Sequence, residues 1–288
     1  MKARRNTLQT RERATMAITF TKMHGLGNDF MVVRWPDDAA LPSAKTVAAW
    51  GNRRTGVGFD QLLLLESPTD TTTRARLKVM NSDGSDAEQC GNGIRCVARF
   101  LAETAEEEFV IGSDAGPIPV QVRSDGLVRA NLGEPRFEPA AVPFVTAEQA
   151  LRYHLRLDSG EVEFGVVSMG NPHAVIAVDS AAAAAVSILG PELEQHPSFP
   201  QGVNVGFMQR VADDAICLRV FERGAGETLA CGTGAAAAVA VGRLWDLLGS
   251  HVSVRLPGGE LIVDWQGPGS DLWQTGPAEQ VYEARISL

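Results

Sequence analysis

The chain has 288 residues, of which 44% are hydrophobic and 21% are charged, and its formal net charge is −9. This composition supports a buried core and excludes a disordered chain, and its length suits one large domain or two ordinary ones. The acidic balance offers no global positive field to nucleic acid or to an anionic membrane, and no apolar run approaches the roughly 20 residues needed to cross a bilayer, so we expect no nucleic-acid or membrane partner.

The chain starts with a basic segment, residues 1–16, in which five Lys and Arg residues stand against one acid, Glu12. No apolar stretch follows it, so it is not a secretory signal. A transit peptide or a nucleic-acid arm would have a similar composition. We expect a disordered basic extension or a misplaced start, because Met16 directly precedes the first strand-like segment.

Short runs rich in β-branched residues, bounded by Gly, Pro, Asn and Asp, predict strands along most of the chain. In the first half they cover residues 17–23, 29–35, 61–67, 76–82, 108–113, 118–124 and 127–133. In the second half they cover 161–169, 174–180, 203–209, 215–223, 251–258 and 260–266. Helices are predicted at 43–50, 93–105, 146–151, 181–189 and 234–248. The last helix is apolar or small on every side, which is typical of a helix enclosed by other structure.

Three features recur in the same order and predict an internal duplication. They are Gly27 with Gly170, Gly56 with Gly202, and Cys90 with Cys231, at offsets of 141 to 146 residues. We therefore predict an α+β fold of two pseudo-symmetric domains, each a curved, mostly antiparallel sheet wrapped around a central helix. The N-terminal domain is expected over residues 17–134 plus 277–288 and the C-terminal domain over 135–276, with the boundary in a Pro- and Gly-rich stretch.

Four cysteines in a chain of this length are not a disulfide framework, and their spacing is a weak zinc signal, so we expect free thiols in a reducing cytoplasm and no metal site. Cys90 and Cys231 each open a Cys-Gly-x-Gly sequence before a helical segment. A helix N-terminus presents unpaired N–H groups and the positive end of the dipole, which bind anions and lower a thiol pKa from about 8.5. Cys96 and Cys217 are expected to be structural.

Two such elements facing one another would present two sulfurs and two sets of N–H donors to one substrate. One sulfur could remove an α-proton and the other return a proton to the opposite face, while the donors stabilise the enediolate. The duplication therefore predicts a two-base racemase or epimerase. The alternatives are that each cysteine is a small buried hydrophobe, or that the protein is a non-enzymatic ligand-binding protein or a thiol redox protein.

The sequences "MHGLGNDF", "GFDQ", "NSDGSDAEQCGNG", "GNPH", "VNVGF" and "FERGAGETLACGTGA" resemble the signatures of the diaminopimelate epimerase family. They occur in the family's order and cover nearly the whole chain after Met16. The resemblance implies interconversion of LL- and meso-diaminopimelate in lysine and peptidoglycan precursor synthesis, by a cytoplasmic homodimer without pyridoxal phosphate, other cofactor or metal. A proline-racemase-like enzyme is the rival within the same fold.

The resemblance also implies roles for individual residues. Cys90 and Cys231 become the acid/base pair, and His173 and Glu222 influence thiol ionisation on the two sides. The residues implied to contact substrate are Asn28, Gln61, Asn81, Gly91, Asn92, Asn171, Asn204, Glu222, Arg223, Gly232 and Thr233. Tyr282 is implied at the dimer contact, although it could equally lie in a closing strand packed on the first domain.

The substrate implied by the resemblance carries an amino-acid group at each end, which suits these residue types. Arg223 can pair with the distal carboxylate through two parallel hydrogen bonds. Asparagine side chains donate and accept, so they can hold ammonium and carboxylate groups together. Asn81, Asn171 and Asn204 could alternatively be turn residues, because all three lie near turn-like Gly or Pro.

Overall fold

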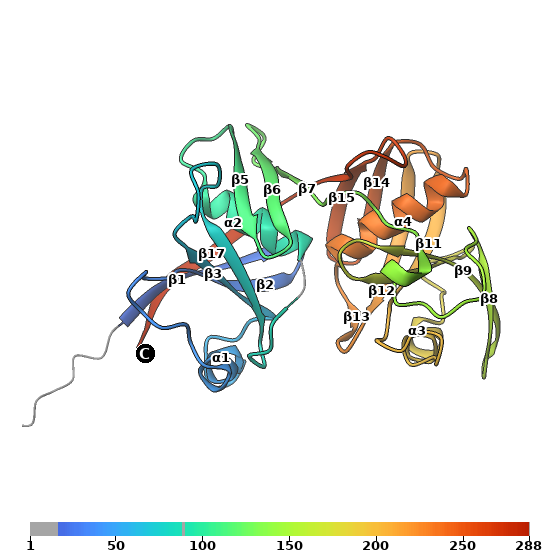
Figure 1. Cartoon of the computed structure of the whole chain (residues 1–288), viewed down its shortest axis with the longest axis horizontal. Coiled ribbons are helices and arrows are strands. Elements are labelled where there is room, and N and C mark those ends of the chain that lie inside the picture. Colours follow the sequence, from blue (N-terminus) through green and yellow to red (C-terminus); the bar gives the residue numbers. More distant parts are fainter. Residues whose placement is uncertain (1–16, 88–89, 288) are drawn as a thin grey trace, which may run out of the picture.

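A computed structural model of the chain describes residues 17–87 and 90–287. The predicted basic extension over residues 1–16 lies outside the described residues. The described chain forms two sheet-rich lobes that lie side by side, with one long helix in each (Figure 1). No helix in this part of the chain is long and apolar enough to span a membrane.

The first lobe contains the elements up to β7. They are β1 (Ala17–Gly25), β2 (Asn28–Arg34), α1 (Ala44–Gly51), β3 (Gln61–Glu66), β4 (Arg76–Asn81), α2 (Gly91–Leu101), β5 (Glu107–Ser113), β6 (Gly116–Val122) and β7 (Val128–Asn131). Helix α1 begins at the N-cap Ser43, whose side chain accepts a hydrogen bond from Thr46 N and so satisfies a donor of the first turn.

The remaining elements follow β7 in sequence, and most of them lie in the second lobe. They are η1 (Pro139–Ala141), β8 (Tyr153–Leu157), β9 (Gly160–Ser168), β10 (Pro172–Ala177), α3 (Val186–Glu194), β11 (Asn204–Ala212), β12 (Ala215–Glu222), β13 (Gly226–Thr228), α4 (Gly232–Leu244), β14 (His251–Leu256), β15 (Gly259–Asp264), β16 (Trp273–Gly276) and β17 (Glu279–Ser287). Eleven of the thirteen residues of α4 are buried, as its apolar composition predicts.

The duplication is visible in the strand pairing. Strands β1 to β4 pair antiparallel, parallel and antiparallel in turn, and β9 to β12 repeat this series. Parallel pairs β4–β5 and β12–β14 follow, and the long helix precedes β5 and β14 in each half. The predicted α+β fold with two pseudo-symmetric halves is thus confirmed, and the exact domain limits stay a prediction.

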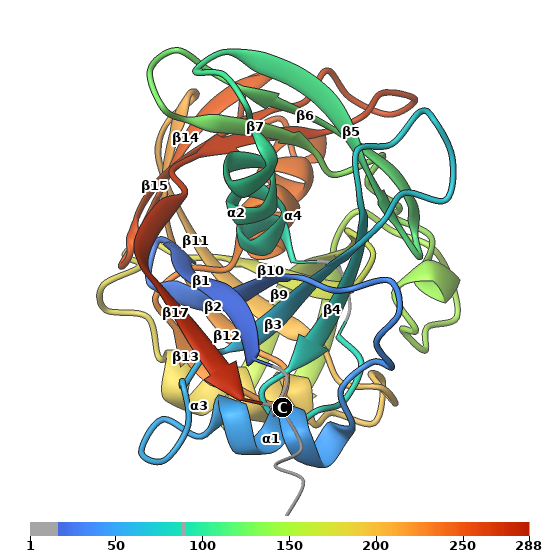
Figure 2. The same cartoon turned by 90° about the vertical axis from the view of Figure 1, so that its left-hand side faces the viewer.

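Two strand pairs tie the ends of the chain together. Strand β7 pairs antiparallel with β16, and β17 then pairs with β1 along its whole length (Figure 2). The C-terminal strand therefore closes the sheet of the first lobe, although it follows the second lobe in sequence. The β7–β16 pair and the β1–β17 pair therefore connect the two lobes.

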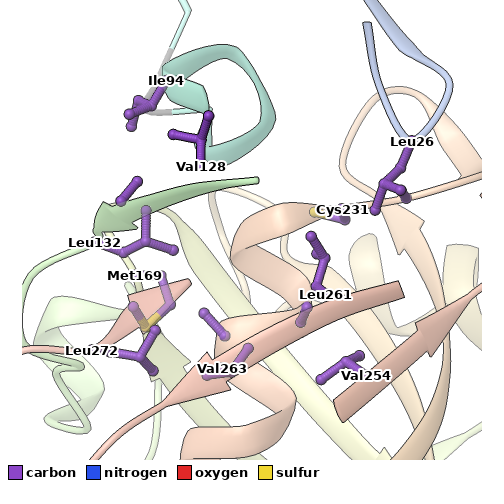
Figure 3. Close-up of a cluster of buried hydrophobic side chains, with 14 of the residues drawn as sticks. Leu26, Ile94, Val128, Leu132, Met169, Cys231, Val254, Leu261, Val263 and Leu272 are labelled. Carbon is purple, nitrogen blue, oxygen red and sulfur yellow. The ribbon is translucent and has the colours of Figure 1, made fainter. Parts of the chain in front are cut away.

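The apolar core has three parts. The largest surrounds α2 and α4 and contains residues from both lobes, including Ile94, Val128, Leu261 and Leu272 (Figure 3). The other two lie on the outer sheet faces, where α1 covers one sheet and α3 the other. Burial of this much apolar surface on both sides of each long helix holds the helices in place.

The predicted helix at residues 146–151 is wrong, and that segment has no regular structure. Its backbone serves tertiary contacts, because Ala150 N donates to Tyr153 Oη at 2.9 Å and Leu151 O accepts from Trp245 Nε1 at 2.8 Å. The helix predicted at 181–189 begins later, at Val186. The Arg219 guanidinium binds three carbonyl oxygens between residues 181 and 184, which keeps that stretch out of the helix.

Candidate active site

Cys90 and Cys231 occupy the same position at the starts of the two buried helices. Cys90 is the N-cap of α2, with φ −122° and ψ 105°, and Cys231 is the N-cap of α4, with φ −115° and ψ 111°. Each carbonyl accepts the first intrahelical hydrogen bond, at 2.9 Å from Ile94 N and 3.0 Å from Ala235 N. The predicted pairing of thiol and helix N-terminus is therefore present twice, with the same backbone geometry.

The two helix ends touch through glycine. A Cβ atom added to Gly91 would lie 3.7 Å from Gly232 Cα, and one added to Gly232 would lie 3.2 Å from Asn92 Oδ1. Both added atoms would also approach Gln274 Oε1, at 3.2 and 3.0 Å. A side chain at either position would press on Gln274, and one at position 232 would also press on Asn92, so glycine eases the close approach of the first turns of α2 and α4.

A cavity of about 810 Å³ opens at this junction. All eleven residues predicted to contact substrate line it, together with both cysteines. Further lining residues that the sequence did not single out are Gly27, Arg53, Asp60, Ser82, Asp83, Asp86, Gly224, Ala225, Glu227, Thr228, Leu229 and Ala230. The tertiary structure thus brings the predicted residues of both halves together, although what each of them does stays a prediction.

The strand register explains why residues from both halves meet. Gln61 pairs with Phe30 in the first lobe, and Asn204 pairs with His173 in the second. Asn81 pairs with Gln61 in the first lobe. In the second lobe the register of β11 and β12 puts Glu222 opposite Asn204, so Glu222 is the counterpart of Asn81. The two walls therefore have matched positions but different chemistry, with an amide in one lobe and a carboxylate in the other.

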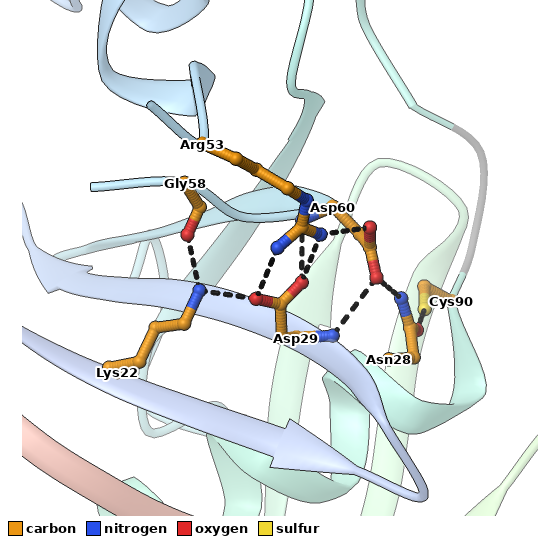
Figure 4. A network of polar contacts seen from close by, with 7 residues as sticks. All are labelled: Lys22, Asn28, Asp29, Arg53, Gly58, Asp60 and Cys90. Carbon is orange, nitrogen blue, oxygen red and sulfur yellow. Dashed lines mark hydrogen bonds and ion pairs between the residues drawn. The ribbon is translucent and has the colours of Figure 1, made fainter. Parts of the chain in front are cut away.

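The Cys90 thiol lies at the end of a polar network (Figure 4). Its Sγ donates to Asn28 Oδ1 at 3.5 Å, and Asn28 Nδ2 donates to Asp60 Oδ2 at 2.9 Å. Arg53 joins Asp60 to Asp29, at 2.6 and 2.7 Å. The network fixes the orientation of the Asn28 amide, so that its oxygen and not its nitrogen faces the sulfur.

Two of these groups have strongly shifted pKa values. Burial acts against ionisation of Asp29, but hydrogen bonds and charge attraction from Arg53 and Lys22 outweigh it and hold the pKa of Asp29 well below its usual range. A hydrogen bond from Arg53 to Asp29 raises the pKa of Arg53. Lys22 also donates to the Gly58 carbonyl. Asp29 and Arg53 are therefore both charged at neutral pH.

The Cys231 thiol has a different set of partners. Its Sγ lies 3.6 Å from Thr233 Oγ1, which accepts from Asn171 Nδ2 at 3.2 Å. Asn171 Oδ1 in turn lies 2.9 Å from His173 Nε2. Glu222 also hydrogen-bonds Cys231, and it accepts from Thr228 Oγ1 at 2.5 Å. His173 and Glu222, which the sequence assigned to opposite sides, thus both reach the Cys231 side, and the Glu222 charge also acts on Cys90.

Burial dominates the ionisation of the two thiols. It raises the pKa of Cys90 to about 11, because the Gly93 and Asn92 N–H groups and the Arg95 charge offset only part of the lost hydration. Burial and the Glu222 charge raise the pKa of Cys231 well above its usual value. The expected lowering by the helix N-termini is therefore wrong: the helix fields act in that direction but are smaller than the desolvation.

The two neighbouring titratable groups are shifted toward their neutral forms. Burial raises the pKa of Glu222, which makes it a stronger base than a surface carboxylate. Burial and the Arg223 charge lower the pKa of His173 to about 3, so the imidazole is neutral at physiological pH. His173 can therefore affect Cys231 through hydrogen bonds and not through a positive charge.

The predicted contact residues differ in how much hydrogen-bonding capacity remains. Asn204 uses both ends of its amide on backbone, with Pro172 O at 2.9 Å and Arg223 N at 3.0 Å, so it holds the wall in shape. Gln61 donates to Asn81 Oδ1 at 3.2 Å, whereas its Oε1 is buried with no hydrogen-bond partner in residues 17–87 and 90–287. An unpaired buried acceptor in a cavity wall is suited to a donor on a ligand.

Two further residues connect the site and were missed in the sequence. Arg95 and Gln274 are fully buried and join the two helix starts through hydrogen bonds. The sequence could have revealed Arg95, because an arginine in a helix that is otherwise buried is unusual. It offered no such indication for Gln274, which lies in a short strand.

Among the described residues no group of three His, Cys, Asp or Glu side chains is arranged to hold a metal ion. Tyr282 lies on β17, 43% exposed.

Comparison with known proteins gives one consistent family. The diaminopimelate epimerase family model matches residues 20–138 and 165–281, once in each half. Relatives named diaminopimelate epimerase from Pseudomonas savastanoi pv. phaseolicola and Stutzerimonas stutzeri are each 48% identical over 276 residues, which cover 95% of this chain and all of the relative.

Solved structures share the fold at low identity. A hydroxyproline epimerase from Agrobacterium vitis aligns with a TM-score of 0.71 at 17% identity, covering 94% of this chain and 93% of its own. A probable proline racemase from Agrobacterium radiobacter gives 0.69 at 17% identity, with the same coverage. The fold is therefore shared by enzymes that are named for different substrates, so the fold by itself does not select a substrate.

The raised pKa values lead to a prediction for the alkylation of Cys90. Alkylation of Cys90 by iodoacetamide needs the thiolate, so at pH 7 it should be slower than alkylation of a free cysteine, whose pKa is about 8.5. The rate should rise with pH toward a midpoint near 11. Mass spectrometry of the Cys90 peptide measures it, and a midpoint below pH 8 would contradict the prediction.

Proposed function

The chain belongs to the diaminopimelate epimerase family, and we propose that it interconverts LL- and meso-2,6-diaminopimelate with Cys90 and Cys231 as its acid/base pair. As a member of this family it is an amino-acid epimerase, and its reaction belongs to lysine biosynthesis. The observation that carries the assignment of the two cysteines is the contact of two cysteine-capped helix starts in one cavity.

The reacting carboxylate binds at the junction of the two helices. The first turns of α2 and α4 line the cavity with Gly91, Asn92, Gly232 and Thr233. N–H groups of a first turn have no intrahelical acceptor, and both helix dipoles favour negative charge there. The pseudo-symmetry of the lobes supports a placement of Cys90 and Cys231 on opposite sides of the α-carbon. Removal of the proton on one side and its return on the other inverts the centre without any other acid or base.

The proton balance starts at Glu222. Its raised pKa and its hydrogen bond with Cys231 allow it to take the thiol proton, which leaves a Cys231 thiolate and a neutral Glu222 acid. The thiolate removes the α-proton of one stereoisomer, and the negative charge passes to the carboxylate as an enediolate. The Cys90 thiol then donates its proton to the opposite face and becomes the thiolate. The same steps in the opposite order perform the reverse reaction.

The far end of the substrate is held by groups away from the sulfurs. The unpaired Gln61 Oε1 can accept from an ammonium group, and Arg223 can bind the distal carboxylate. Asn204 holds Arg223 through its backbone N–H, and His173 holds Asn171. A site that hydrogen-bonds both charged groups rejects an amino acid that lacks the second end, because its buried polar groups would be left unpaired.

One experiment tests substrate and reaction together. The full chain is incubated with LL-diaminopimelate in deuterium oxide and followed by NMR. Deuterium should appear at one α-carbon as the meso isomer forms, because the proton returned from the second thiol exchanges with solvent. L-Proline and trans-4-hydroxy-L-proline serve as comparison substrates, since proteins with this fold carry those names. Turnover of either one without turnover of diaminopimelate would refute the proposal.

The roles of the two cysteines give a second prediction. Cys90→Ser and Cys231→Ser should each reduce kcat by about 10²–10⁴-fold, because each removes one acid/base group, with little change in thermal stability. Cys217→Ser is the matched control, since Cys217 lies on β12 outside the cavity lining. It should keep wild-type activity. Full activity in either of the first two variants would exclude the two-thiol mechanism.

We also propose a cytoplasmic homodimer that forms along β17. Most residues of this strand are exposed, and Val281 and Tyr282, which lie where its pairing with β1 shifts register, are 56% and 43% exposed. The Tyr282 ring packs edge-on against Phe20 at 6.1 Å between centroids, which fixes its orientation.

Sedimentation of the wild-type protein at micromolar concentration should give a dimer, and Tyr282→Arg should shift the equilibrium toward monomer. A wild-type monomer would contradict this proposal and leave the proposed reaction unaffected.

A further inference from the structure

Arg95 is a fully buried cation whose partners are all neutral. Its guanidinium donates to Gln274 Oε1 at 2.5 Å, Asn92 Oδ1 at 2.6 Å, and the carbonyls of Gly91 and Pro277 at 3.4 Å each. Among the described residues no carboxylate forms an ion pair with it. Burial lowers the pKa of Arg95 only to about 10, so it stays charged at neutral pH.

The structure provides space for this side chain. Arg95 follows Gly91 by one helical turn, and its guanidinium lies back toward the start of α2. A Cβ atom added to Gly276 would lie 3.1 Å from Arg95 Nε, and one added to Gly25 would lie 3.4 Å from Nη2. Bare backbone on two sides therefore leaves room for the guanidinium directly behind the cavity wall.

The hydrogen bonds of Arg95 orient two amides that reach the other lobe. Gln274 accepts from Arg95, so its Nε2 faces Gly232 O and donates to it at 2.7 Å. Asn92 also accepts from Arg95, so its Nδ2 faces Ala230 O at 3.3 Å. Ala230 and Gly232 are the residues on either side of Cys231. One side chain from the helix of Cys90 thus fixes the backbone that flanks the opposite thiol.

The charge of Arg95 adds to the field at the same point. The positive ends of the α2 and α4 dipoles already meet there. A third positive charge without a buried counter-ion is costly unless an anion completes the site. The proposed substrate carboxylate would supply one negative charge on binding, and the enediolate formed from it would supply more.

We propose that Arg95 is a positioning residue that holds the two cysteine-capped helix starts in register, and that its buried charge stabilises the anion formed between them. The inference rests on the proposed function, because it takes the anion to be the reacting carboxylate. The charged or titratable groups that face Cys90 are Arg95 from its own helix and Glu222 from β12. Those that face Arg95 are Cys90 and Cys96.

The test compares Arg95→Met, which removes the charge and the hydrogen bonds, with Arg95→Lys, which keeps the charge. Arg99→Met is the matched control, because Arg99 is exposed one turn further along α2. Arg95→Met should lower kcat by about 100-fold, as loss of a donor to a developing anion does, and change KM by less than about threefold. Arg95→Lys should recover part of kcat, and Arg99→Met should match wild type.

A second readout needs no substrate. The rate of Cys90 alkylation by iodoacetamide at pH 9 reports the thiolate fraction, and it should fall about threefold or more in Arg95→Met while Arg95→Lys stays near wild type. A wild-type alkylation rate together with kcat within threefold of wild type in Arg95→Met would overturn the proposal. If the wild-type protein did not turn over diaminopimelate, the proposed function would fail. The alkylation rates would still show whether the charge of Arg95 raises the thiolate fraction of Cys90.

If circular dichroism shows that Arg95→Met does not fold, Gln274→Met and Arg95→Lys decide instead. Gln274→Met breaks the connection to Gly232 and leaves the charge in place, so kcat should fall about tenfold with unchanged alkylation of Cys90. Wild-type kcat in both variants would overturn the positioning role.

Discussion

The contact between the first turns of α2 and α4 is the constraint on which the site depends. Gly91 and Gly232 allow two helix N-termini to approach within van der Waals distance, at a place where their dipoles repel. The apolar core around both helices, the β7–β16 pair and the return of β17 to β1 hold the ends together against this repulsion. The result is a fixed positive region between two thiols, and only an anion satisfies it.

The duplication gives the two cysteines the same backbone geometry, but the side chains around them differ in the two halves. Cys90 and Cys231 share one backbone conformation, and Asn28 and Asn171 lie at matching places beside them. The charged groups differ: Cys231 has Glu222 as a direct partner, whereas Cys90 faces an amide held by an ion-pair network. A two-base reaction needs one thiolate and one thiol at a time, and this difference in surroundings can distinguish them in the resting protein.

Desolvation and helix fields act in opposite directions on these thiols. Desolvation is the larger effect, so both thiols are held in the neutral form, which also limits their oxidation and alkylation. The field of the helix starts remains, and it acts on any charge that forms during the reaction. The site therefore favours the anionic intermediate more than it favours a resting thiolate, which is the difference that lowers a barrier.

The sequence by itself determined the repeat, the α+β class and the two capping cysteines, because short motifs carry their local backbone geometry wherever they fold. The residues expected at the cavity followed from the family resemblance of those motifs, and all of them line the cavity. It did not determine which partners those residues meet. Residues 146–151 are not helical because Trp245 and Tyr153 engage their backbone, and the thiol pKa values rise because the lobes exclude water. Arg95 and Gln274 act across 179 positions of sequence. Burial and long-range hydrogen bonding depend on the packing of distant segments, so only the tertiary structure decided them.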